Sequence, residues 1–269
     1  MDIVTLRSLL AGLPVPQVRY FDVIGSTNDE AMTWIMAGAK DGCLVVADQQ
    51  TAGRGRFNRR WVTHPGAALA FSVILHPTAA EMEAPGFFSA LGALALSQAL
   101  EDNLGLKPSI KWPNDVLLER RKAAGILVET AWLGDQMQGM IIGIGLNVTP
   151  DAVPPADQLM FPAISVAEAV QAAGYFADID RWAMLRAALQ ALFVLRGQMH
   201  TGAFHQAWQD RLAFKDEWVQ VESASGQPGS QTLTGQVVGL DPSGGLLLRV
   251  TGGKIIPVAV GDVHLRPAE

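Results

Sequence analysis

An arginine-rich loop at residues 53–61 is the strongest chemical signal in the sequence. Its nine residues read GRGRFNRRW and hold Arg54, Arg56, Arg59 and Arg60 with no acidic residue among them. A guanidinium group offers a planar fork of donors that suits phosphate and carboxylate groups, and glycine lets the backbone approach a ligand closely. We therefore interpret the loop as a clamp for a compact anion such as a nucleotide phosphate. A solvated basic loop would have the same composition, and the glycine spacing is not that of a Walker A loop.

Two lysine-containing segments follow at 111–118 (KWPNDVLL) and 122–129 (KAAGILVE). Pro113-Asn114-Asp115 has the composition of a turn between two strands. At the mouth of a sheet, Lys111 and Asp115 would face a nucleotide, and Asp115 could then help to hold Mg²⁺. Lys122 opens a strand that is otherwise free of positive charge. A plain turn and a solvent-facing lysine remain open alternatives for these two segments.

Two weaker signals come from short polar or glycine-containing stretches. Ser26-Thr27-Asn28 stands where a helix should begin, so its hydroxyl groups could cap that helix or could bind a small polar ligand. The segment 143–148 (GIGLNV) carries two glycines inside an apparent strand. Glycine weakens a strand and suggests close approach by a ligand or another backbone, with Asn147 beside that approach.

The elements that must position these residues follow from hydrophobic periodicity and turn chemistry. Thr27 and Glu30 have the spacing of a capping box, as have Ser165 and Glu168. A proline-rich stretch at 150–162 predicts a long loop, which is often a functional lid. We expect strands at 18–23, 43–47, 68–75, 109–112, 116–119, 124–132 and 137–148, and helices at 27–37, 86–104, 165–173, 179–197 and 201–213.

The pattern changes near residue 217. Short strand-like runs at 218–222, 232–240, 245–250 and 255–260 are separated by glycine-, proline- and serine-rich turns. This spacing is typical of a small all-β barrel. We therefore expect two domains, a mixed α+β domain over residues 1–216 and a small β domain over residues 217–269.

Composition narrows the class of protein. The chain has 269 residues, of which 49% are hydrophobic and 17% charged, and this balance excludes a disordered chain. Its formal net charge of −6 argues against a general nucleic-acid binder. Cys43 is the single cysteine, so an internal disulfide is ruled out and a reducing compartment is indicated. The chain shows neither a signal-peptide start nor an apolar run of the roughly 20 residues that span a bilayer, and we expect a cytoplasmic protein.

In this order and spacing, the motifs resemble those of the biotin–protein ligase family, which biotinylates acetyl-CoA carboxylase. GRGRFNRRW is similar to the family's G-R-G-R-x-x-R-x-W, KWPND matches outright, and KAAGIL matches K-x-A-G-I-L. The resemblance runs from about residue 18 to the end of the chain. It departs from the family at Phe57-Asn58, where smaller residues are common, and this puts the local loop conformation in doubt.

The resemblance implies a fold similar to the class II synthetase and biotin ligase catalytic domain, followed by a C-terminal Src-homology-3-like barrel. It implies an ATP-dependent, AMP-forming ligase that uses Mg²⁺. Biotin and ATP would give biotinyl-5′-AMP and pyrophosphate, and a lysine of a biotin carboxyl carrier domain would then attack the mixed anhydride. No membrane or nucleic-acid partner is implied, and a homodimer is left open.

Residue roles are implied by the same resemblance. Lys122, Arg56 and Asp115 are the expected catalytic residues, with Asp115 also the expected Mg²⁺ ligand. Ser26, Thr27, Asn28 and Gln50 match positions that bind the biotin rings, while 54–56 match the loop that folds over biotin and the adenylate. The complete set expected to contact biotin or ATP is Ser26, Thr27, Asn28, Gln50, Arg54, Gly55, Arg56, Trp61, Lys111, Asn114, Lys122, Gly125, Gly145 and Asn147.

Two rival functions stay in view. A lipoate- or octanoate-protein ligase is built on a similar catalytic fold, but the arginine loop and the C-terminal barrel favour biotin. A non-catalytic biotin or nucleotide sensor would not need the full set of Lys122, Arg56 and Asp115. Bifunctional members of the family carry an N-terminal helix-turn-helix domain, for which about 17 residues before the first strand are too few. We therefore expect no binding to operator DNA.

Overall fold

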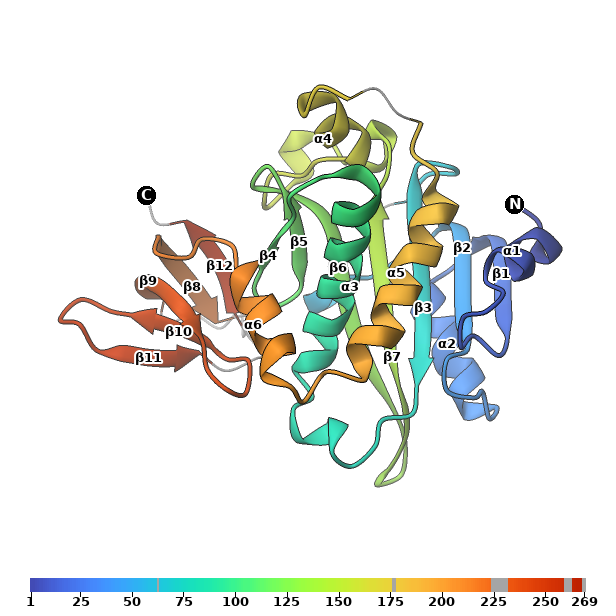
Figure 1. Ribbon diagram of the computed structural model, residues 1–269, viewed down its shortest axis with the longest axis horizontal. Helices are drawn as coiled ribbons and strands as arrows, with labels where there is room; N and C mark the ends of the chain where they lie inside the picture. Colours follow the sequence, from blue (N-terminus) through green and yellow to red (C-terminus); the bar gives the residue numbers. More distant parts are fainter. Residues whose placement is uncertain (62, 176–177, 224–231, 259–262, 268–269) are drawn as a thin grey trace.

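Two β-sheets organise the protein, and they are joined by helices (Figure 1). The computed structural model describes residues 1–61, 63–175, 178–223, 232–258 and 263–267 of the chain. The larger sheet contains β1 (Val18–Ile24), β2 (Leu44–Gln50), β3 (Ala68–Leu75), β4 (Ser109–Lys111), β5 (Asp115–Leu118), β6 (Arg121–Leu133) and β7 (Gln136–Asn147). The smaller sheet contains β8 (Trp218–Ser223), β9 (Leu233–Leu240), β10 (Leu246–Arg249), β11 (Ile255–Val258) and β12 (Val263–Pro267). The helices are α1 (Ile3–Leu9), α2 (Thr27–Met36), α3 (Phe87–Leu104), α4 (Val166–Ala172), α5 (Arg181–Arg196) and α6 (Gly202–Asp210).

The larger sheet is mixed, with the strand order β1-β2-β3-β7-β6-β5-β4. Strands β1 and β2 pair in parallel, and each of the other neighbouring strands pairs antiparallel. The stretch from β4 to β7 is the meander that the sequence predicts. The predicted α+β class is therefore confirmed, and the motif-bearing strands β5, β6 and β7 lie side by side.

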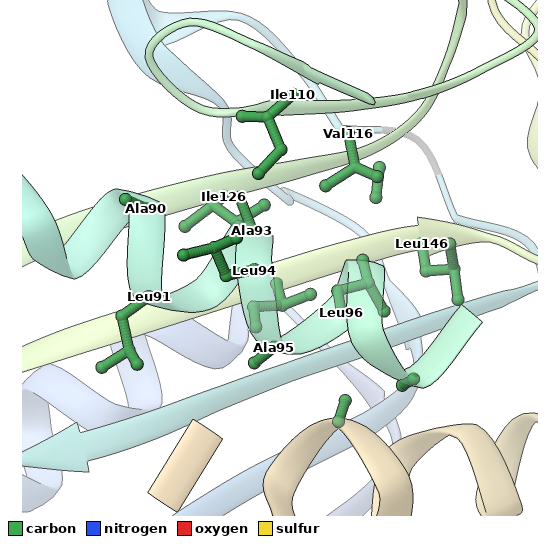
Figure 2. Packing of buried hydrophobic residues seen from close by; sticks show 14 of the residues in the cluster. Ala90, Leu91, Ala93, Leu94, Ala95, Leu96, Ile110, Val116, Ile126 and Leu146 are labelled. Carbon is green, nitrogen blue, oxygen red and sulfur yellow. The ribbon is translucent and has the colours of Figure 1, made fainter. Parts of the chain in front are cut away.

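One face of the larger sheet carries α3 and α5 (Figure 1). Successive residues of a strand point to opposite faces, so Phe71, Ile126 and Ile144 share this face, and they belong to the main hydrophobic core. Figure 2 shows the alanine and leucine side chains of α3 beside the aliphatic residues of the sheet. Because α3 packs on the sheet and is flanked by α5 and α6, it is apolar almost all round. It ends at Gly105, whose φ of 63° is the left-handed conformation that glycine adopts without strain.

The opposite face is covered only in part by α2. Ala31, Trp34 and Ile35 of this helix pack on Val45 and Ile74 of the sheet in a second hydrophobic cluster. The first turn of α2 then lies over the middle of β3 and β7, beside residues that are polar or glycine. The rest of this face is therefore free to form a cavity.

The start of α2 differs from the predicted capping box of Thr27 and Glu30. The N-cap residue is Ser26, which makes no side-chain cap bond. The backbone N–H and the hydroxyl of Thr27 both donate to Gln50 Oε1, at 2.8 and 3.1 Å, and Glu30 pairs with Arg19 at 2.6 Å. The capping-box prediction is wrong here because tertiary partners take both side chains. The second predicted box, Ser165 with Glu168, is confirmed at the start of α4.

The smaller sheet is antiparallel, with the order β11-β10-β9-β8-β12. Four of its strands were expected, although residues 259–260 of the last expected run lie outside the described residues, and β12 was not predicted. Pairing between β11 and β12 would close a barrel, and it is not seen in the described part of the chain, so closure stays a prediction. Trp112 Nε1 donates to the Gly244 carbonyl at 2.9 Å, and Trp208, Val219 and Leu246 belong to the main core. We keep the domain boundary near residue 216 as a proposal.

Within the described ranges, no helix combines the length and the apolar character needed to cross a membrane.

Candidate active site

A cavity of about 460 Å³ opens on the sheet face that α2 covers only in part. Its volume is in the range of small-molecule sites. Every residue that the sequence analysis assigned to catalysis or ligand binding lines this cavity. These are Ser26, Thr27, Asn28, Gln50, Arg54, Gly55, Arg56, Trp61, Lys111, Asn114, Asp115, Lys122, Gly125, Gly145 and Asn147.

Glycines of β6 and β7 form the floor of the cavity. Gly125 pairs with Gly145, and Gly143 lies opposite Ser72 of β3. A Cβ atom on Gly143 would lie 2.1 Å from Asn28 Oδ1, and one on Gly145 would lie 2.4 Å from the Trp61 ring. The close approach expected at these glycines is therefore made by two protein side chains. Asn28 and Trp61 rest on bare backbone, and this fixes the depth of the cavity.

We expect Gly143→Ala to lower the free energy of unfolding by about 1–3 kcal/mol, because the added methyl group displaces a hydrogen-bonded Asn28. Gly202→Ala is the matched control, since a Cβ atom there meets nothing within 4 Å. That control should stay within about 0.5 kcal/mol of the wild type. Urea unfolding of both variants measures the difference, and equal stabilities would show that Asn28 does not depend on the bare backbone.

A chain of buried polar side chains crosses one end of the cavity. Ser72 Oγ donates to Asn28 Oδ1 at 2.6 Å and lies 2.8 Å from Thr27 Oγ1. Thr27 in turn donates to Gln50 Oε1, and Asn28 Nδ2 donates to Glu129 Oε2 at 2.7 Å. These bonds hold the amide groups of Asn28 and Gln50 in defined orientations. The side chains of Ser26, Thr27, Asn28 and Gln50 that line this end of the cavity are uncharged and rich in hydrogen-bonding groups.

Ser72 and Glu129 are site residues that the sequence analysis missed. Ser72 is fully buried in a strand that is otherwise apolar, ALAFSVIL, and Glu129 follows the apolar run GILV. Successive residues of a strand point to opposite faces of the sheet, so a polar residue within an apolar strand could have indicated that one of the two faces is functional. Ser72 lies outside the segments quoted above, and Glu129 ends the segment 122–129 beyond the KAAGIL that carries the resemblance, so neither residue was assigned a role.

The other end of the cavity holds two lysines and one carboxylate. Asp115 Oδ1 lies 2.6 Å from Lys122 Nζ, and Asp115 Oδ2 lies 3.7 Å from Lys111 Nζ. Burial alone would raise the pKa of Asp115, but the charges of Lys122 and Lys111 outweigh it and hold that pKa below its usual value. Burial lowers the pKa of Lys111, which Asp115 opposes only in part. The cluster carries a net positive charge beside the neutral end, as a site for an anionic group requires.

Asp115 fits poorly as a ligand for Mg²⁺ in this arrangement. Both of its oxygens face lysine ammonium groups, which would repel a divalent cation. Across the described ranges, no group of three or more His, Cys, Asp or Glu could hold a metal ion. A Mg²⁺ ion carried by ATP needs few protein ligands, because phosphates and water fill most of its coordination shell. The assignment of a metal to Asp115 stays a prediction, and no step below depends on it.

The proline-rich segment 150–162 forms one wall of the cavity, and its role as a lid stays a prediction. It contains two short 3₁₀ turns, η3 (Pro150–Ala152) and η4 (Ala156–Gln158), and contributes Phe161, whose ring centre lies 4.5 Å from Lys111 Nζ. The backbone N–H of Lys122 donates to the Pro162 carbonyl at 2.7 Å, and Ile164 N–H donates back to the Lys122 carbonyl at 3.0 Å. This wall therefore fixes the backbone from which Lys122 reaches into the cavity.

Asn114 and Asn147 hold backbone together at the edge of the cavity. Asn114 Nδ2 donates to the Ile126 carbonyl at 2.9 Å, which ties the turn before β5 to β6. Asn147 Nδ2 donates to the Ile164 carbonyl at 3.2 Å, which ties β7 to the wall segment. The turn interpretation of Pro113-Asn114-Asp115 is confirmed, and this turn lines the cavity.

The arginine loop is folded on itself. Trp61 N–H donates to the Gly53 carbonyl at 2.8 Å, and Gly55 N–H donates to the Arg59 carbonyl at 2.7 Å. Phe57, where the sequence departs from the family pattern, has φ 60° and ψ 39° and leaves 41% of its surface exposed. A short 3₁₀ turn, η1 (Arg56–Asn58), brings this residue to the tip of the loop. Phe57, the residue that differs from the family pattern, therefore adopts a left-handed backbone conformation in the loop, away from the glycines of the cavity floor.

Arg54 and Trp61 show how this loop meets the rest of the protein. Arg54 Nη2 donates to Asp29 Oδ1 and lies 3.2 Å from Glu129 Oε1. Its guanidinium group is thus engaged by protein carboxylates, which differs from the expected role as an anion clamp. Trp61 Nε1 is buried with no hydrogen-bond partner in the described part of the chain, and Lys122 Nζ lies 5.7 Å from the Trp61 ring centre. This nitrogen packs against Gly145 of the cavity floor, where an added Cβ atom would lie 2.5 Å from it.

Comparisons with known proteins agree with this geometry. Residues 20–147 match the Biotin/lipoate A/B protein ligase family, and residues 226–266 match the Biotin protein ligase C terminal domain. The chain is 35% identical over 244 residues to the biotin--[acetyl-CoA-carboxylase] ligase of Paracoccus denitrificans, covering 87% of this chain and 95% of the relative. It is 33% identical over 249 residues to the bifunctional ligase/repressor BirA of Bacillus subtilis strain 168, covering 91% of this chain and 73% of the relative.

Among solved structures, the fold is similar to that of the biotin protein ligase from Aquifex aeolicus in complex with biotin and ATP. The TM-score is 0.78 at 28% sequence identity, and the match covers 94% of this chain and all of the other. The expected fold, a mixed sheet that carries the site together with a small C-terminal β unit, is therefore confirmed.

Proposed function

The chain belongs to the biotin protein ligase family, and on this premise we propose that its cavity activates biotin with ATP and transfers it to a carrier protein. One observation carries the proposal most directly. A positively charged cluster of Lys111, Lys122 and Asp115 stands at one end of a cavity whose other end is neutral and hydrogen-bonding. Biotin combines a neutral ring system with a carboxylate at the end of an aliphatic chain, and this division matches the cavity.

The first half-reaction joins two anions. An oxygen of the biotin carboxylate forms a bond to the α-phosphorus of ATP, the bond from that phosphorus to the bridging oxygen breaks, and pyrophosphate leaves. Mutual repulsion of the two anions is the main obstacle, so preorganised positive charge should supply much of the acceleration. Lys122 and Arg56 are the cations proposed to stabilise the charge, while Mg²⁺ on the phosphates would neutralise part of it.

Asp115 is proposed to hold the two lysines in place. Lys122 Nζ lies 2.6 Å from its carboxylate, so the ammonium group is oriented before any ligand arrives. Lys111 is held from the other side by the same carboxylate and by the ring of Phe161. The arrangement fixes the positions of two charges that would repel each other without their shared partner.

Ring recognition is proposed for the neutral end. Ser26 makes no cap bond with its side chain, so its hydroxyl group can serve a ligand. Asn28 uses both ends of its amide in bonds to Ser72 and Glu129, so it is better suited to shape the wall than to donate to biotin. Gln50 receives both Thr27 donors at Oε1, which fixes the orientation of its amide group.

The second half-reaction consumes the mixed anhydride. A neutral lysine amine of the carrier attacks the acyl carbon, AMP leaves with the bridging oxygen, and the amine loses a proton to solvent. The anhydride is open to hydrolysis, so water must be excluded until the carrier arrives. The arginine loop and the wall segment 150–162 line the cavity on two sides and are proposed to give that protection.

We expect the chain to attach one biotinyl group to a biotin carboxyl carrier domain when biotin, ATP and Mg²⁺ are present, and to attach neither lipoate nor octanoate. The physical reason is the neutral end of the cavity, whose fixed amide and hydroxyl groups would lack partners on a plain acyl chain. Intact-mass spectrometry measures the product. A carrier whose acceptor lysine is replaced by arginine is the control, and equal labelling with lipoate would favour the rival assignment.

Three further expectations stay predictions. A net charge of −6 argues against operator DNA as a partner, since the dense arginine cluster lines the cavity. Cytoplasmic location rests on the single cysteine, Cys43, which indicates a reducing compartment. Pairing of two copies rests on the family resemblance alone.

A further inference from the structure

Three charged residues from distant parts of the sequence meet beside the cavity. Asp29 lies in the first turn of α2, Arg54 in the arginine loop, and Glu129 near the middle of β6. Arg54 Nη2 donates to Asp29 and lies 3.2 and 3.3 Å from the two oxygens of Glu129. One guanidinium group therefore ties the start of the arginine loop to a helix and to the central sheet.

Glu129 has a second partner that belongs to the wall of the cavity. Its Oε2 atom accepts a hydrogen bond from Asn28 Nδ2 at 2.7 Å, and Asn28 Oδ1 accepts from Ser72 at 2.6 Å. Asn28 is 4% exposed and rests on Gly143. The same carboxylate thus contacts both the neutral wall and the loop, although it does not itself line the cavity.

We propose that Glu129 is a positioning residue that anchors the arginine loop before any ligand binds and couples this anchor to the wall formed by Asn28. Most of the Glu129 side chain is buried, and a buried carboxylate is unfavourable unless it is paired; here a cation and an amide donor compensate it. The inference rests on the proposed function, because the loop and the wall are the parts proposed to enclose biotin and its adenylate. An ordered loop lowers the entropy that ligand binding must otherwise remove.

The anchor is electrostatic and partly exposed, and this gives it a distinct signature. The side chains of Arg54 and Glu129 are 40% and 27% exposed, so salt should weaken the contact between them. Glu129→Gln keeps an oxygen that can accept from Asn28 but loses the charge that holds Arg54. Glu129→Ala loses both partners, so the two variants separate the loop anchor from the wall support.

Glu30 supplies the matched control. It is the neighbour of Asp29 on α2, has the same charge and pairs with Arg19 at 2.6 Å, away from the arginine loop. Glu30→Gln therefore removes a carboxylate from α2 and leaves the contacts of Arg54 with Asp29 and Glu129 unchanged. Asp29→Asn removes the charge of the second carboxylate that contacts Arg54, and so measures how much that contact contributes to the anchor.

Hydrogen–deuterium exchange of peptides covering residues 53–61, in protein without ligands, measures the anchor directly. We expect exchange in Glu129→Gln to be about fivefold faster than in the wild type at about 0.05 M salt, with a smaller rise in Asp29→Asn. The wild type should approach the variant at about 0.5 M salt, because screening removes the same attraction. Glu30→Gln should match the wild type at both salt concentrations.

Two results would overturn the proposal. One is wild-type exchange of the loop in Glu129→Gln. The other is faster exchange throughout the molecule together with a lowered melting temperature, since that would make Glu129 a general structural residue. Neither readout depends on enzyme activity. If the protein does not use biotin, the proposed function is wrong, and the anchor can still be tested by exchange.

Steady-state kinetics then test the coupling to the wall. We expect Glu129→Ala to raise the KM for biotin about tenfold and to change kcat less than about twofold, because support of the wall acts on ground state and transition state alike. Glu129→Gln should raise KM less than Glu129→Ala. An equal rise in both variants would contradict a separate role for the bond to Asn28.

Discussion

Replacing Lys122 with alanine is expected to slow adenylate formation at least about a hundredfold, the scale of losing one preorganised charge in an active site. Its ammonium group stands in the cavity, held 2.6 Å from Asp115, where the charge of the two reacting anions must be balanced. The fold should survive, because 27% of the side chain is exposed and the backbone bonds to the wall segment stay. Single-turnover formation of biotinyl-AMP at saturating biotin and ATP measures the effect.

Lys107→Ala is the control for this variant, since Lys107 is an exposed lysine outside the cavity that precedes β4. It should form the adenylate at the wild-type rate. If Lys122→Ala stayed within about threefold of Lys107→Ala, Lys122 would be a surface residue and the charge argument would fail.

Asp115→Asn is expected to lower the free energy of unfolding by about 3 kcal/mol and to abolish most activity as well. The Asp115 side chain is 12% exposed and its carboxylate is shared by Lys111 and Lys122, so its loss leaves two ammonium groups without a counter-charge. Glu217→Gln is the control, because it removes a carboxylate from the exposed ion pair with Arg120. That change should cost less than about 1 kcal/mol in urea unfolding, and equal losses would contradict the shared-carboxylate role.

The same variant should change the dependence of stability on pH. Burial lowers the pKa of Lys111 in the folded protein, so between that pKa and about 10.4 the unfolded chain binds more protons and stability rises with pH. Removing Asp115 lowers the pKa of Lys111 further and widens this window. Raising the pH from about 7 to about 9 should therefore stabilise Asp115→Asn more than the wild type. An equal gain in both proteins would show that Lys111 does not depend on Asp115.

The family resemblance assigned the motifs to one site, and the structure brings them together because they fall on neighbouring strands. KWPND joins β4 to β5, and KAAGIL and GIGLNV lie on β6 and β7. Strands β5, β6 and β7 pair in order, and alternation along each strand sends Asp115, Gly125 and Gly145 to one face. The periodicity of apolar residues located most helices and strands for the same reason, since burial of one face repeats along each element.

What could not be predicted depends on partners that are distant in sequence. Thr27 binds Gln50 instead of capping its own helix, and Arg54 binds Asp29 and Glu129 instead of pointing its charge at a ligand. Such contacts are set by the packing of α2 on the sheet, which local spacing does not specify. The seven-residue helix α1, with its N-cap Asp2, was also missed, because a single buried residue, Leu6, gives no period to recognise.

The central claim is that the cavity activates the carboxylate of biotin with ATP, and exchange of labelled pyrophosphate into ATP tests it most directly. This exchange reports the first half-reaction alone, without a carrier domain. The account predicts exchange that requires biotin and Mg²⁺, that is absent with lipoate or octanoate, and that is lost in Lys122→Ala. Exchange that proceeds without biotin, or equally well with lipoate, would contradict the account.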